Sequence, residues 1–532
     1  MLSRRLRESA LAFVNHARRH TGVGLVCAVA YFDPGNWGVD LQAGSQFGYR
    51  LLFIVLLAGI FAIFFQVSAS RLGVVTGLDL ASNCRLLLHD RPRYTMFYRW
   101  ALLYPLYLLA EVAIIATDLA ELIGSAIALS MLFPKLELWH GVLITTVDVI
   151  FILALGDPLN GRPVKMFELL IACLVFAVLI CMCIIISRIQ ADWGDVFLGY
   201  VPSKYIFHSG GLYTSVGIIG ATVMPHSLFL GSALATQNRL STKDIDDADS
   251  ADDVPLSTGK KTPREYLSQW TTSLKAIFAK PSPATYATRA KTHGERENNS
   301  LLFVKSHLYN GIVDIVTSLL GFAVVINSLI LILAGAVFYT QGINKDGTAS
   351  LFDAYDLIRD TVGQAAATLF AIALLAAGQS SSIIATVAGQ AVSEGFLQWR
   401  TSPVIRRLIT RLIALIPSLA VAIGVGRSGI DTLLVASQVV LSIVLPFVTL
   451  PLIYLTSRFS GVMLVRAPNG PAPVQPSPAS TCSEGTVADT EGGAQWKDFA
   501  NGWIVTGICT AIWFVIAAAN VYVIVQLGLG EQ

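Results

Sequence analysis

Charged residues are scarce in this chain. Only 14% of its 532 residues are Asp, Glu, Lys or Arg, whereas an average soluble domain has about 25%. The 37 basic and 35 acidic residues nearly cancel, to a net charge of +2, so the chain lacks the strongly basic surface that binding to a nucleic-acid backbone requires. The composition therefore argues against a soluble protein and against a nucleic-acid partner.

Cysteine is also scarce and predicts no disulfide framework. The seven cysteines are odd in number, and five of them lie inside apolar segments, namely Cys27, Cys173, Cys181, Cys183 and Cys509. We interpret these as small buried residues. The sequence contains neither a His-Glu-x-x-His nor a Gly-x-Ser-x-Gly motif, so it does not indicate an enzyme.

Apolar sequence, in contrast, is abundant. Hydrophobic residues make up 54% of the chain and its mean hydropathy is +0.63. Runs of about 20 apolar residues, which is enough to cross the hydrocarbon core of a bilayer, recur along it. The chain is predicted to be an all-α polytopic membrane protein. We expect eleven spans, at about 22–47, 51–70, 100–132, 139–156, 164–187, 212–236, 301–338, 364–390, 405–426, 430–457 and 501–527.

Basic residues predict the orientation of these spans. The N-terminal segment 1–21 is an Arg-rich flank, and the loop after the second span contains Arg71, Arg85, Arg91, Arg93 and Arg99. The positive-inside rule then places the N-terminus in the cytosol. Two polar segments, 239–300 and 467–495, are too poor in apolar residues to order themselves firmly. We expect a cytosolic loop and a low-complexity linker there.

The first span is interrupted near its middle by Asp33-Pro34-Gly35-Asn36. Proline removes a backbone donor and glycine loosens the backbone, so the helix should unwind here. Unwound backbone inside a membrane is tolerated only where it lines a cavity, and a carboxylate at the centre of a span costs at least about 2.5–3.5 kcal/mol. Asp33 is therefore a candidate functional residue. The alternative is an Asp that only caps the half-helix after it.

The sixth span is interrupted in the same way by Gly220-Ala221-Thr222-Val223-Met224-Pro225-His226-Ser227. Breaks in the first and sixth spans occupy corresponding positions of two five-helix halves, which is typical of an inverted-repeat transporter with its site at the midplane. We expect a first repeat at 22–187, a second at 212–457 that contains the 239–300 loop, and an additional eleventh helix at 501–527.

The two breaks together predict a cation site. Asp33 and Asn36 offer carboxylate and amide oxygens, Ala221 offers a freed carbonyl, and Met224 offers a thioether. Oxygen ligands alone suit Mg²⁺ or Ca²⁺, whereas sulfur shifts the preference toward Mn²⁺, Fe²⁺ and later transition metals. Met224 taken alone would be interpreted as core packing, but its position beside the second break favours a ligand.

The third span carries Glu111, Asp118 and Glu121, whose offsets of seven and three place them on one helix face. Buried acids in a row predict a proton relay, and the alternative is a static ladder of salt bridges. His226 lies beside the second break and can change charge near neutral pH. It is either part of the proton pathway or a satisfied core histidine.

Four strings carry a family resemblance: DPGNWGVDLQAGSQFGYRLL, the MPH of the sixth span, LLAAGQSSSIIATVAGQAVSEGFL at 374–397 and SQVVLSIVLPF at 437–447. With them the chain resembles the Nramp family of proton-coupled divalent-metal transporters, over nearly all of its membrane segments. The resemblance implies a LeuT-type fold with discontinuous first and sixth helices. It implies that the metal is held by Asp33, Asn36, the Ala221 carbonyl and Met224.

The resemblance also implies roles outside the two breaks. Gln438 would join the metal in an occluded state. Arg411 would pair with Asp118 or Glu121, with Arg407 as the substitute if the register differs.

The chain departs from the usual family pattern at a few places. The 239–300 insertion is more typical of a fungal member than of a bacterial one. Ser227, Gly231 and Val444 stand where the family often has Asn, His and Gln. These departures bear on proton handling and rate more than on the choice of metal.

The function expected from these observations is proton-coupled import of Mn²⁺ or Fe²⁺ into the cytosol, with the metal as substrate and no cofactor. We expect a monomer in the plasma, vacuolar or endosomal membrane. One alternative is a metal-sensing receptor that signals through the 239–300 loop. Another is an amino-acid or sodium symporter of the same fold, which an anionic Asp33 disfavours. A magnesium-selective relative is disfavoured by Met224.

Overall fold

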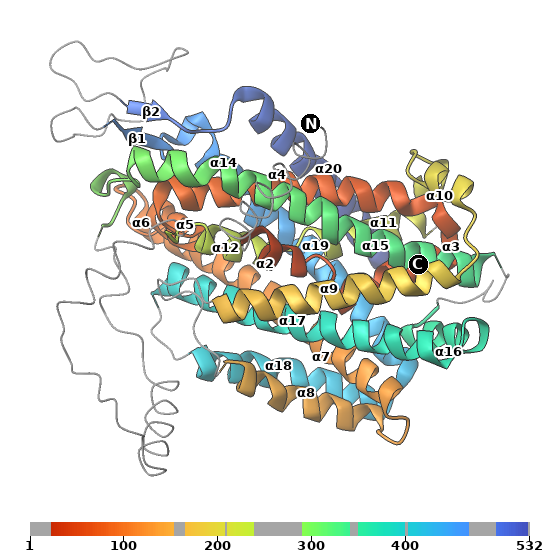
Figure 1. The fold of residues 1–532 in the computed structure, drawn as a ribbon. Helices are drawn as coiled ribbons and strands as arrows, with labels where there is room; N and C mark the ends of the chain where they lie inside the picture. Colours follow the sequence, from red (N-terminus) through yellow and green to blue (C-terminus); the bar gives the residue numbers. More distant parts are fainter. Residues whose placement is uncertain are drawn as a thin grey trace, which may run out of the picture.

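The computed structural model describes residues 23–153, 165–207, 210–238, 290–340, 349–398, 403–467 and 496–529. The predicted N-terminal flank and most of the two polar segments lie outside these described residues. The described part is a bundle of helices that run roughly side by side, with a small hairpin of two strands at one end (Figure 1).

Helical segments account for nearly all of the described chain, and short 3₁₀ or π turns are labelled η. The first half contains α2 (Val23–Val29), α3 (Pro34–Phe47), η1 (Gly48–Leu51), α4 (Leu52–Thr76), α5 (Leu80–Leu88), α6 (Thr95–Phe97), η2 (Tyr98–Leu103), α7 (Tyr104–Leu132), α8 (Leu138–Leu153), α9 (Lys165–Arg188), α10 (Trp193–Gly199) and η3 (Lys204–Phe207). The second half contains α11 (Gly211–Thr222), α12 (Pro225–Leu234), η6 (His293–Glu295), α14 (Leu301–Ser318), η7 (Leu319–Val324), α15 (Val325–Ala334), η8 (Gly335–Tyr339), α16 (Leu351–Thr361), α17 (Gln364–Leu397), α18 (Pro403–Gly424), α19 (Arg427–Thr456), η9 (Arg458–Ser460), β1 (Leu464–Arg466), β2 (Trp496–Asp498) and α20 (Trp503–Leu529).

Each of the eleven predicted spans falls on a helix or a helix pair. Within the described residues, eight helical stretches are long and apolar enough to cross a membrane, and one of them, Pro34–Thr76, contains both α3 and α4. The shorter helices α8 and α18 cover the two remaining spans. The prediction of a polytopic all-α membrane protein is confirmed.

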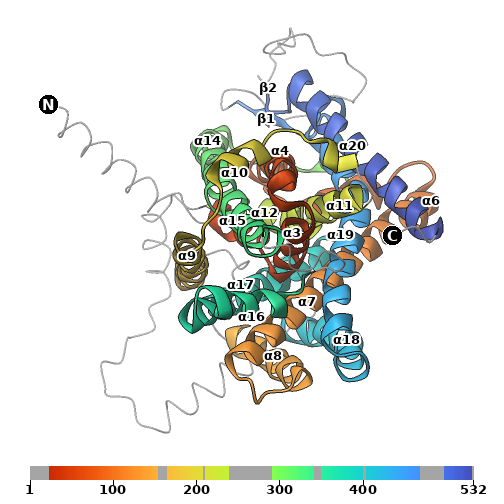
Figure 2. The same cartoon turned by 90° about the vertical axis from the view of Figure 1, so that its right-hand side faces the viewer.

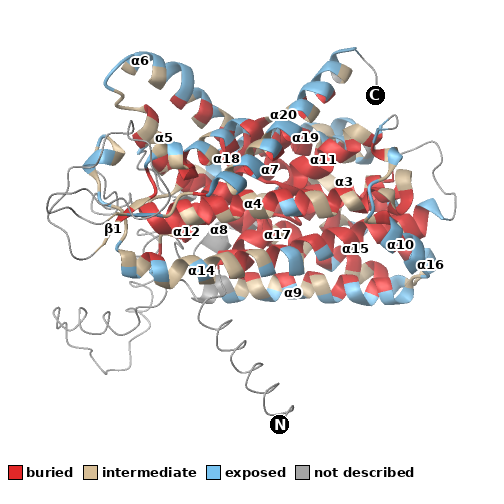
Figure 3. Ribbon diagram, turned by 90° about the horizontal axis from the view of Figure 1, so that it is seen from above, coloured by how far each residue is buried: buried red, intermediate tan, exposed pale blue. Residues whose placement is uncertain are grey.

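The centre of the bundle is formed by α3, α7, α11, α17 and α19, while α8, α9, α18 and α20 lie around it (Figure 2). Burial follows the same division, since the central helices are mostly buried along their length and the peripheral ones expose one side (Figure 3). Small residues let the central helices approach closely. A Cβ on Gly124 of α7 would lie 2.0 Å from Pro34, and one on Gly378 of α17 would lie 2.4 Å from Ser125.

Residues 291–299, here called the strap, dock against the end of α4. The side chain of Asn299 donates to the carbonyl of Val74 at 2.9 Å, and Arg296 donates to the carbonyls of Thr76 and Gly77. The carbonyls of Val74 and Thr76 lie in the last turn of α4, and that of Gly77 directly follows it. At this end a helix leaves carbonyl acceptors without intrahelical partners. The imidazole of His293 contacts Asn83 Oδ1 at 3.0 Å.

The strap is also joined to the strand hairpin. Asn298 donates to the carbonyls of Val462 and Leu464, at 2.7 and 2.8 Å. In the hairpin, β1 and β2 are antiparallel, with Val465 opposite Lys497. The expectation that 239–300 is a solvated loop therefore does not hold for its last residues, because side-chain hydrogen bonds order them without a large apolar area.

Protonation of His293 should loosen the strap. Burial and the nearby charges of Arg296 and Arg91 lower the pKa of His293 to about 4, whereas an unfolded histidine has a pKa of about 6.5. Between pH 4 and 6.5, His293 therefore binds a proton more readily when the strap is undocked than when it is docked. Docking is fully stable above about pH 6.5 and weakens as the pH falls toward 4. The cost reaches up to about 3 kcal/mol. Amide exchange of residues 290–300 should rise over this pH range, after correction for intrinsic rates.

His293→Gln is the matched control, because its amide can still donate to Asn83 but does not titrate. The same rise in exchange in this variant would contradict the assignment to His293.

Candidate metal centre

The first break separates α2 from α3 at residues 30–33. Asp33 is the N-cap of α3, where its Oδ1 accepts from the Asn36 backbone N–H at 3.0 Å and from the Asn36 side-chain amide at 2.7 Å. Pro34 follows at the first helical position, where a missing N–H costs nothing. Asp33 therefore does cap its half-helix, but only Oδ1 serves this purpose.

The second break separates α11 from α12 at Val223 and Met224. In a continuous helix the carbonyl of Ala221 would accept from the residue four positions later, which is Pro225 and has no N–H. Instead this carbonyl accepts from the side-chain amide of Asn36 at 2.9 Å. The Asn36 amide thus joins the two broken helices.

The residues of both breaks are withdrawn from solvent. Asp33, Ala221, Met224 and Gln438 are 0% exposed, and Asn36 is 1% exposed. Two of their oxygens, Asp33 Oδ2 and Gln438 Oε1, have no hydrogen-bond partner among the described residues. A buried oxygen without a partner costs free energy, so these two atoms are available ligands.

Gln438 of α19 lies directly against the first break. A Cβ on Gly35 would be 1.8 Å from its Nε2. The structure therefore places Gln438 beside the loop that carries Asp33, where the family resemblance placed it. Met224 is the N-cap of α12, and its carbonyl accepts from the Ser227 hydroxyl at 2.8 Å.

The donor set has one carboxylate, amide and carbonyl oxygens, and one thioether. No group of three or more His, Cys, Asp or Glu side chains with metal-binding geometry occurs among the described residues. A strongly held structural metal usually takes several such ligands. The donor set present, one carboxylate with neutral oxygens and a sulfur, has the chemistry of ligands for a divalent transition-metal ion.

The three predicted acids of α7 form two separate groups along the helix. Asp118 and Glu121 are fully buried. Glu121 accepts from the Ser381 hydroxyl at 2.8 Å, and Arg411 donates to the Asp118 backbone carbonyl at 3.1 Å and to the Ser382 hydroxyl at 2.7 Å. Arg411 thus contacts α7 at Asp118 through the backbone carbonyl, and its pairing with the carboxylate of Asp118 or Glu121 stays a prediction.

Glu111 is separate from this group. It forms a salt bridge with Arg406 at 2.7 Å, and both side chains are only slightly exposed. The sequence analysis did not propose Arg406 as a partner of the α7 acids. The side chain of Arg407, which it named as the substitute, lies outside the described residues. For Glu111 the geometry supports the static salt bridge that was the alternative to a relay.

His226 connects the second break to α7. Its Nδ1 is 3.2 Å from the hydroxyl of Thr117, the residue before Asp118, and its Nε2 has no partner among the described residues. The imidazole is 1% exposed. It is therefore the link, through Thr117, between the proposed metal ligands and the buried acids.

The sequence analysis missed Gln66 of α4, which contacts the end of α2 and the first break. Its Oε1 accepts from the Tyr31 hydroxyl at 2.8 Å and its Nε2 lies 3.2 Å from Cys27 Sγ. The Ser227 hydroxyl lies 2.8 Å from that of Tyr31. A Cβ at Gly231 would lie 1.6 Å from Gln66 Nε2, so this glycine makes room for the amide. A lone amide in the apolar run IFAIFFQVSAS was the available signal.

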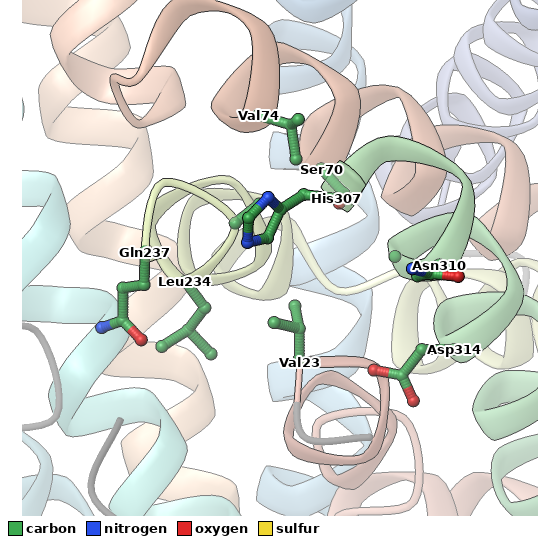
Figure 4. A pocket seen from close by; sticks show the side chains of 10 residues that line it. Val23, Ser70, Val74, Leu234, Gln237, His307, Asn310 and Asp314 are labelled. Atoms are coloured by element: carbon green, nitrogen blue, oxygen red, sulfur yellow. The ribbon is translucent and has the colours of Figure 1, made fainter. Parts of the chain in front are cut away.

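A small cleft of about 30 Å³ lies away from this centre, between α2, α4, α12 and α14 (Figure 4). Its lining includes Val23, Gln237, His307 and Asp314, and it has room for about one or two water molecules. Asp314 Oδ2 accepts from the Gly24 backbone N–H at 2.7 Å, which caps the start of α2. The cleft therefore belongs to the anchoring of α2.

Two discontinuous helices around a buried polar centre define a secondary transporter of the LeuT type. The nucleobase-cation-symport-1 transporter Mhp1 has this fold in common, at a TM-score of 0.51 and 11% identity over 83% of this chain and 80% of that one.

The family profile described as natural resistance-associated macrophage protein-like matches residues 24–256 and 283–463, and the chain belongs to this Nramp family. It is 40% identical to the manganese transporter pdt1 of Schizosaccharomyces pombe, over 96% of this chain and 85% of that protein. It is 38% identical to the iron transporter SMF3 of Saccharomyces cerevisiae, over 96% of both. A crystal structure of the Eremococcus coleocola manganese transporter matches with a TM-score of 0.64 and 29% identity, over 94% of this chain and 85% of that one.

Gly35→Ala should abolish transport, because the new methyl group and the Gln438 amide cannot share one position. We expect loss of Mn²⁺ uptake in proteoliposomes with the protein still inserted and monodisperse. Gly507→Ala is the matched control, since nothing lies within 4 Å of a Cβ on this helical glycine. Normal uptake by Gly35→Ala would show that Gln438 does not need its place beside the first break.

Proposed function

We propose that this chain transports Mn²⁺ or Fe²⁺ across a membrane into the cytosol together with protons. The observation that carries the proposal is the Asn36 amide, which lies between Asp33 Oδ1 and the Ala221 carbonyl at 2.7 and 2.9 Å. One buried oxygen from each broken helix thus accepts a hydrogen bond from the same NH₂ group. The named activities of the pdt1 and SMF3 relatives support a transition metal as the substrate.

The metal would replace the amide donor between these oxygens. A cation that is bound by Asp33 and the Ala221 carbonyl displaces the NH₂ group, and Asn36 then turns its side-chain oxygen inward. Asp33 Oδ2 and Gln438 Oε1, which have no partner among the described residues, can complete an oxygen shell. The Met224 thioether favours Mn²⁺ and Fe²⁺ over alkaline-earth ions. The metal is cargo, and no resident cofactor is proposed.

The proton would move through α7. His226 is within hydrogen-bonding reach of Thr117, and Asp118 and Glu121 follow on the same buried helix. Arg411, which donates to the Asp118 backbone carbonyl and to the Ser382 hydroxyl, would hold this part of α7 against α18. Glu111, which is paired with Arg406, would be a fixed salt bridge at the end of this row of acids and not a carrier of the proton.

Charge at the two ends of the bundle supports a cytosolic N-terminus. Arg85, Arg91 and Arg99 lie at the end where α4 finishes and α7 begins, whereas Asp353 and Asp356 lie on α16 at the other end (Figure 1). The positive-inside rule assigns the first end to the cytosol. One chain supplies every proposed ligand, so we propose a monomer, in a plasma, vacuolar or endosomal membrane.

Asp33→Ala should abolish Mn²⁺ uptake into proteoliposomes and the accompanying change in internal pH, because it removes the only carboxylate among the proposed ligands.

Asp118→Asn should keep Mn²⁺ binding within a few-fold of wild type but reduce the proton movement, because Asp118 lies on a different helix from the ligands. The measurement follows Mn²⁺ and internal pH in the same vesicles.

Two outcomes would contradict this scheme. Near-normal uptake by folded Asp33→Ala would remove Asp33 from the metal centre. Loss of Mn²⁺ binding by Asp118→Asn to the same degree as by Asp33→Ala would make Asp118 a ligand and not a proton carrier.

Met224→Ala should retain reduced Mn²⁺ uptake and allow Ca²⁺ to compete. Removing the thioether leaves oxygen ligands and space for a water, which is the set that Ca²⁺ prefers. A tenfold loss of discrimination corresponds to about 1.4 kcal/mol, a reasonable amount for one exchanged ligand. The measurement is Mn²⁺ uptake with excess Ca²⁺ at matched protein amounts. Unchanged rejection of Ca²⁺ would show that Met224 only fills the core.

A further inference from the structure

Residues 89–103, here called the ledge, join α5 to α7 and consist of α6, η2 and the turn before them. Four of its large side chains are strongly exposed, with Tyr94 at 79%, Met96 at 65%, Phe97 at 61% and Trp100 at 65%. An exposed cluster of this size is unusual on a surface that faces only water.

The ledge lies where a lipid headgroup layer would meet the protein. It is at the end of the bundle where α4 finishes and α7 begins (Figure 1), and it projects sideways beyond the neighbouring helices (Figures 2 and 3). Tyr and Trp side chains gather at this level in membrane proteins, because their rings suit the boundary between headgroups and hydrocarbon. The position thus accounts for the aromatic side chains without a protein partner.

Basic side chains outnumber acidic ones in the ledge. Asp90 is the single acid of the ledge, and it is paired with Arg99 at 2.5 Å and lies 2.9 Å from the His89 imidazole. Arg91 lies over the Tyr98 ring at 5.3 Å. Arg93 is exposed and forms no ion pair or hydrogen bond with the described residues. Arg91 Nε also donates to the Leu87 carbonyl at 2.8 Å. Within the described part of the chain, the guanidinium groups of Arg91 and Arg93 therefore have no acidic partner.

We propose that the ledge is a binding site for anionic phospholipid headgroups, with Arg93 and Arg91 on the phosphate or carboxylate and Phe97 and Trp100 between the acyl chains. Arginine binds such anions through two parallel donors. Protein interfaces are enriched in the same residue types, so the choice of lipid rests on the position of the ledge at the headgroup level, with Arg91 and Arg93 together at the start of the aromatic run. The inference does not depend on the transported ion.

Arg93 provides the cleanest test, because its removal breaks no contact with the described residues. The purified full-length protein is loaded in detergent with fluorescent phosphatidylserine or phosphatidylcholine, and the retained lipid is measured. We expect wild type to retain phosphatidylserine preferentially. Arg93→Gln should weaken this binding about fivefold, the factor that corresponds to about 1 kcal/mol per basic residue near an anionic surface. Arg93→Lys should largely restore it.

Arg359→Gln is the matched control, because Arg359 is an exposed arginine on α16 at the opposite end of the bundle. It should leave retention unchanged. Equal retention of the two lipids, no effect of Arg93→Gln, or an equal effect of Arg359→Gln would each overturn the proposal. Full competition by inorganic phosphate would point to a free-anion site, and a change in oligomeric state with unchanged lipid binding would point to a protein interface. Either result would also overturn it.

Discussion

The structure depends on interrupting two helices inside an apolar environment without leaving their backbone groups unsatisfied. A carbonyl or N–H that loses its helical partner in a membrane costs several kcal/mol, so each break must be completed by another part of the chain. At the first break, the side chains of Asn327 and Trp37 donate to the carbonyls of Tyr31 and Phe32. At the second break, the Asn36 amide donates to the Ala221 carbonyl, and it also donates to the Asp33 carboxylate of the first break. The same bond therefore holds the two repeats in register and gathers the oxygens that a cation would take.

This arrangement requires the neighbouring helices to come unusually close. Gln438 lies on Gly35, Pro34 lies on Gly124, and a Cβ on Gly220 would be 2.4 Å from Ser442. In two of these contacts a glycine at a break faces a side chain of α19, and in the other Gly124 of α7 faces Pro34 of the first break. The small residues of α7 and α17 are thus part of the centre, because a larger residue there would push the broken segments apart.

The composition of the chain was sufficient to predict the parts of the site that are local. Proline, glycine and a carboxylate inside an apolar run identify a break whatever surrounds it, so Asp33, Asn36 and Ala221 could be proposed together. Partners that depend on helix rotation could not be predicted in this way. Glu111 is paired with Arg406, although Arg407 and Arg411 were equally available in the sequence. The contacts of Gln66 and of the strap also depend on how distant segments meet.

In the proposed coupling, the metal is bound by the broken helices and the proton moves to the continuous helix α7. This division has an electrostatic consequence. The carboxylate of Asp33 alone does not neutralise a divalent cation, so a metal bound as proposed would leave positive charge at this buried centre. Such a charge is costly in a low-dielectric interior, and it opposes a second positive charge on His226. A proton held there would move away from the metal, and Thr117 directs the imidazole toward the α7 helix that carries Asp118. Because α7 is continuous, its acids can accept that proton without moving when the broken helices do.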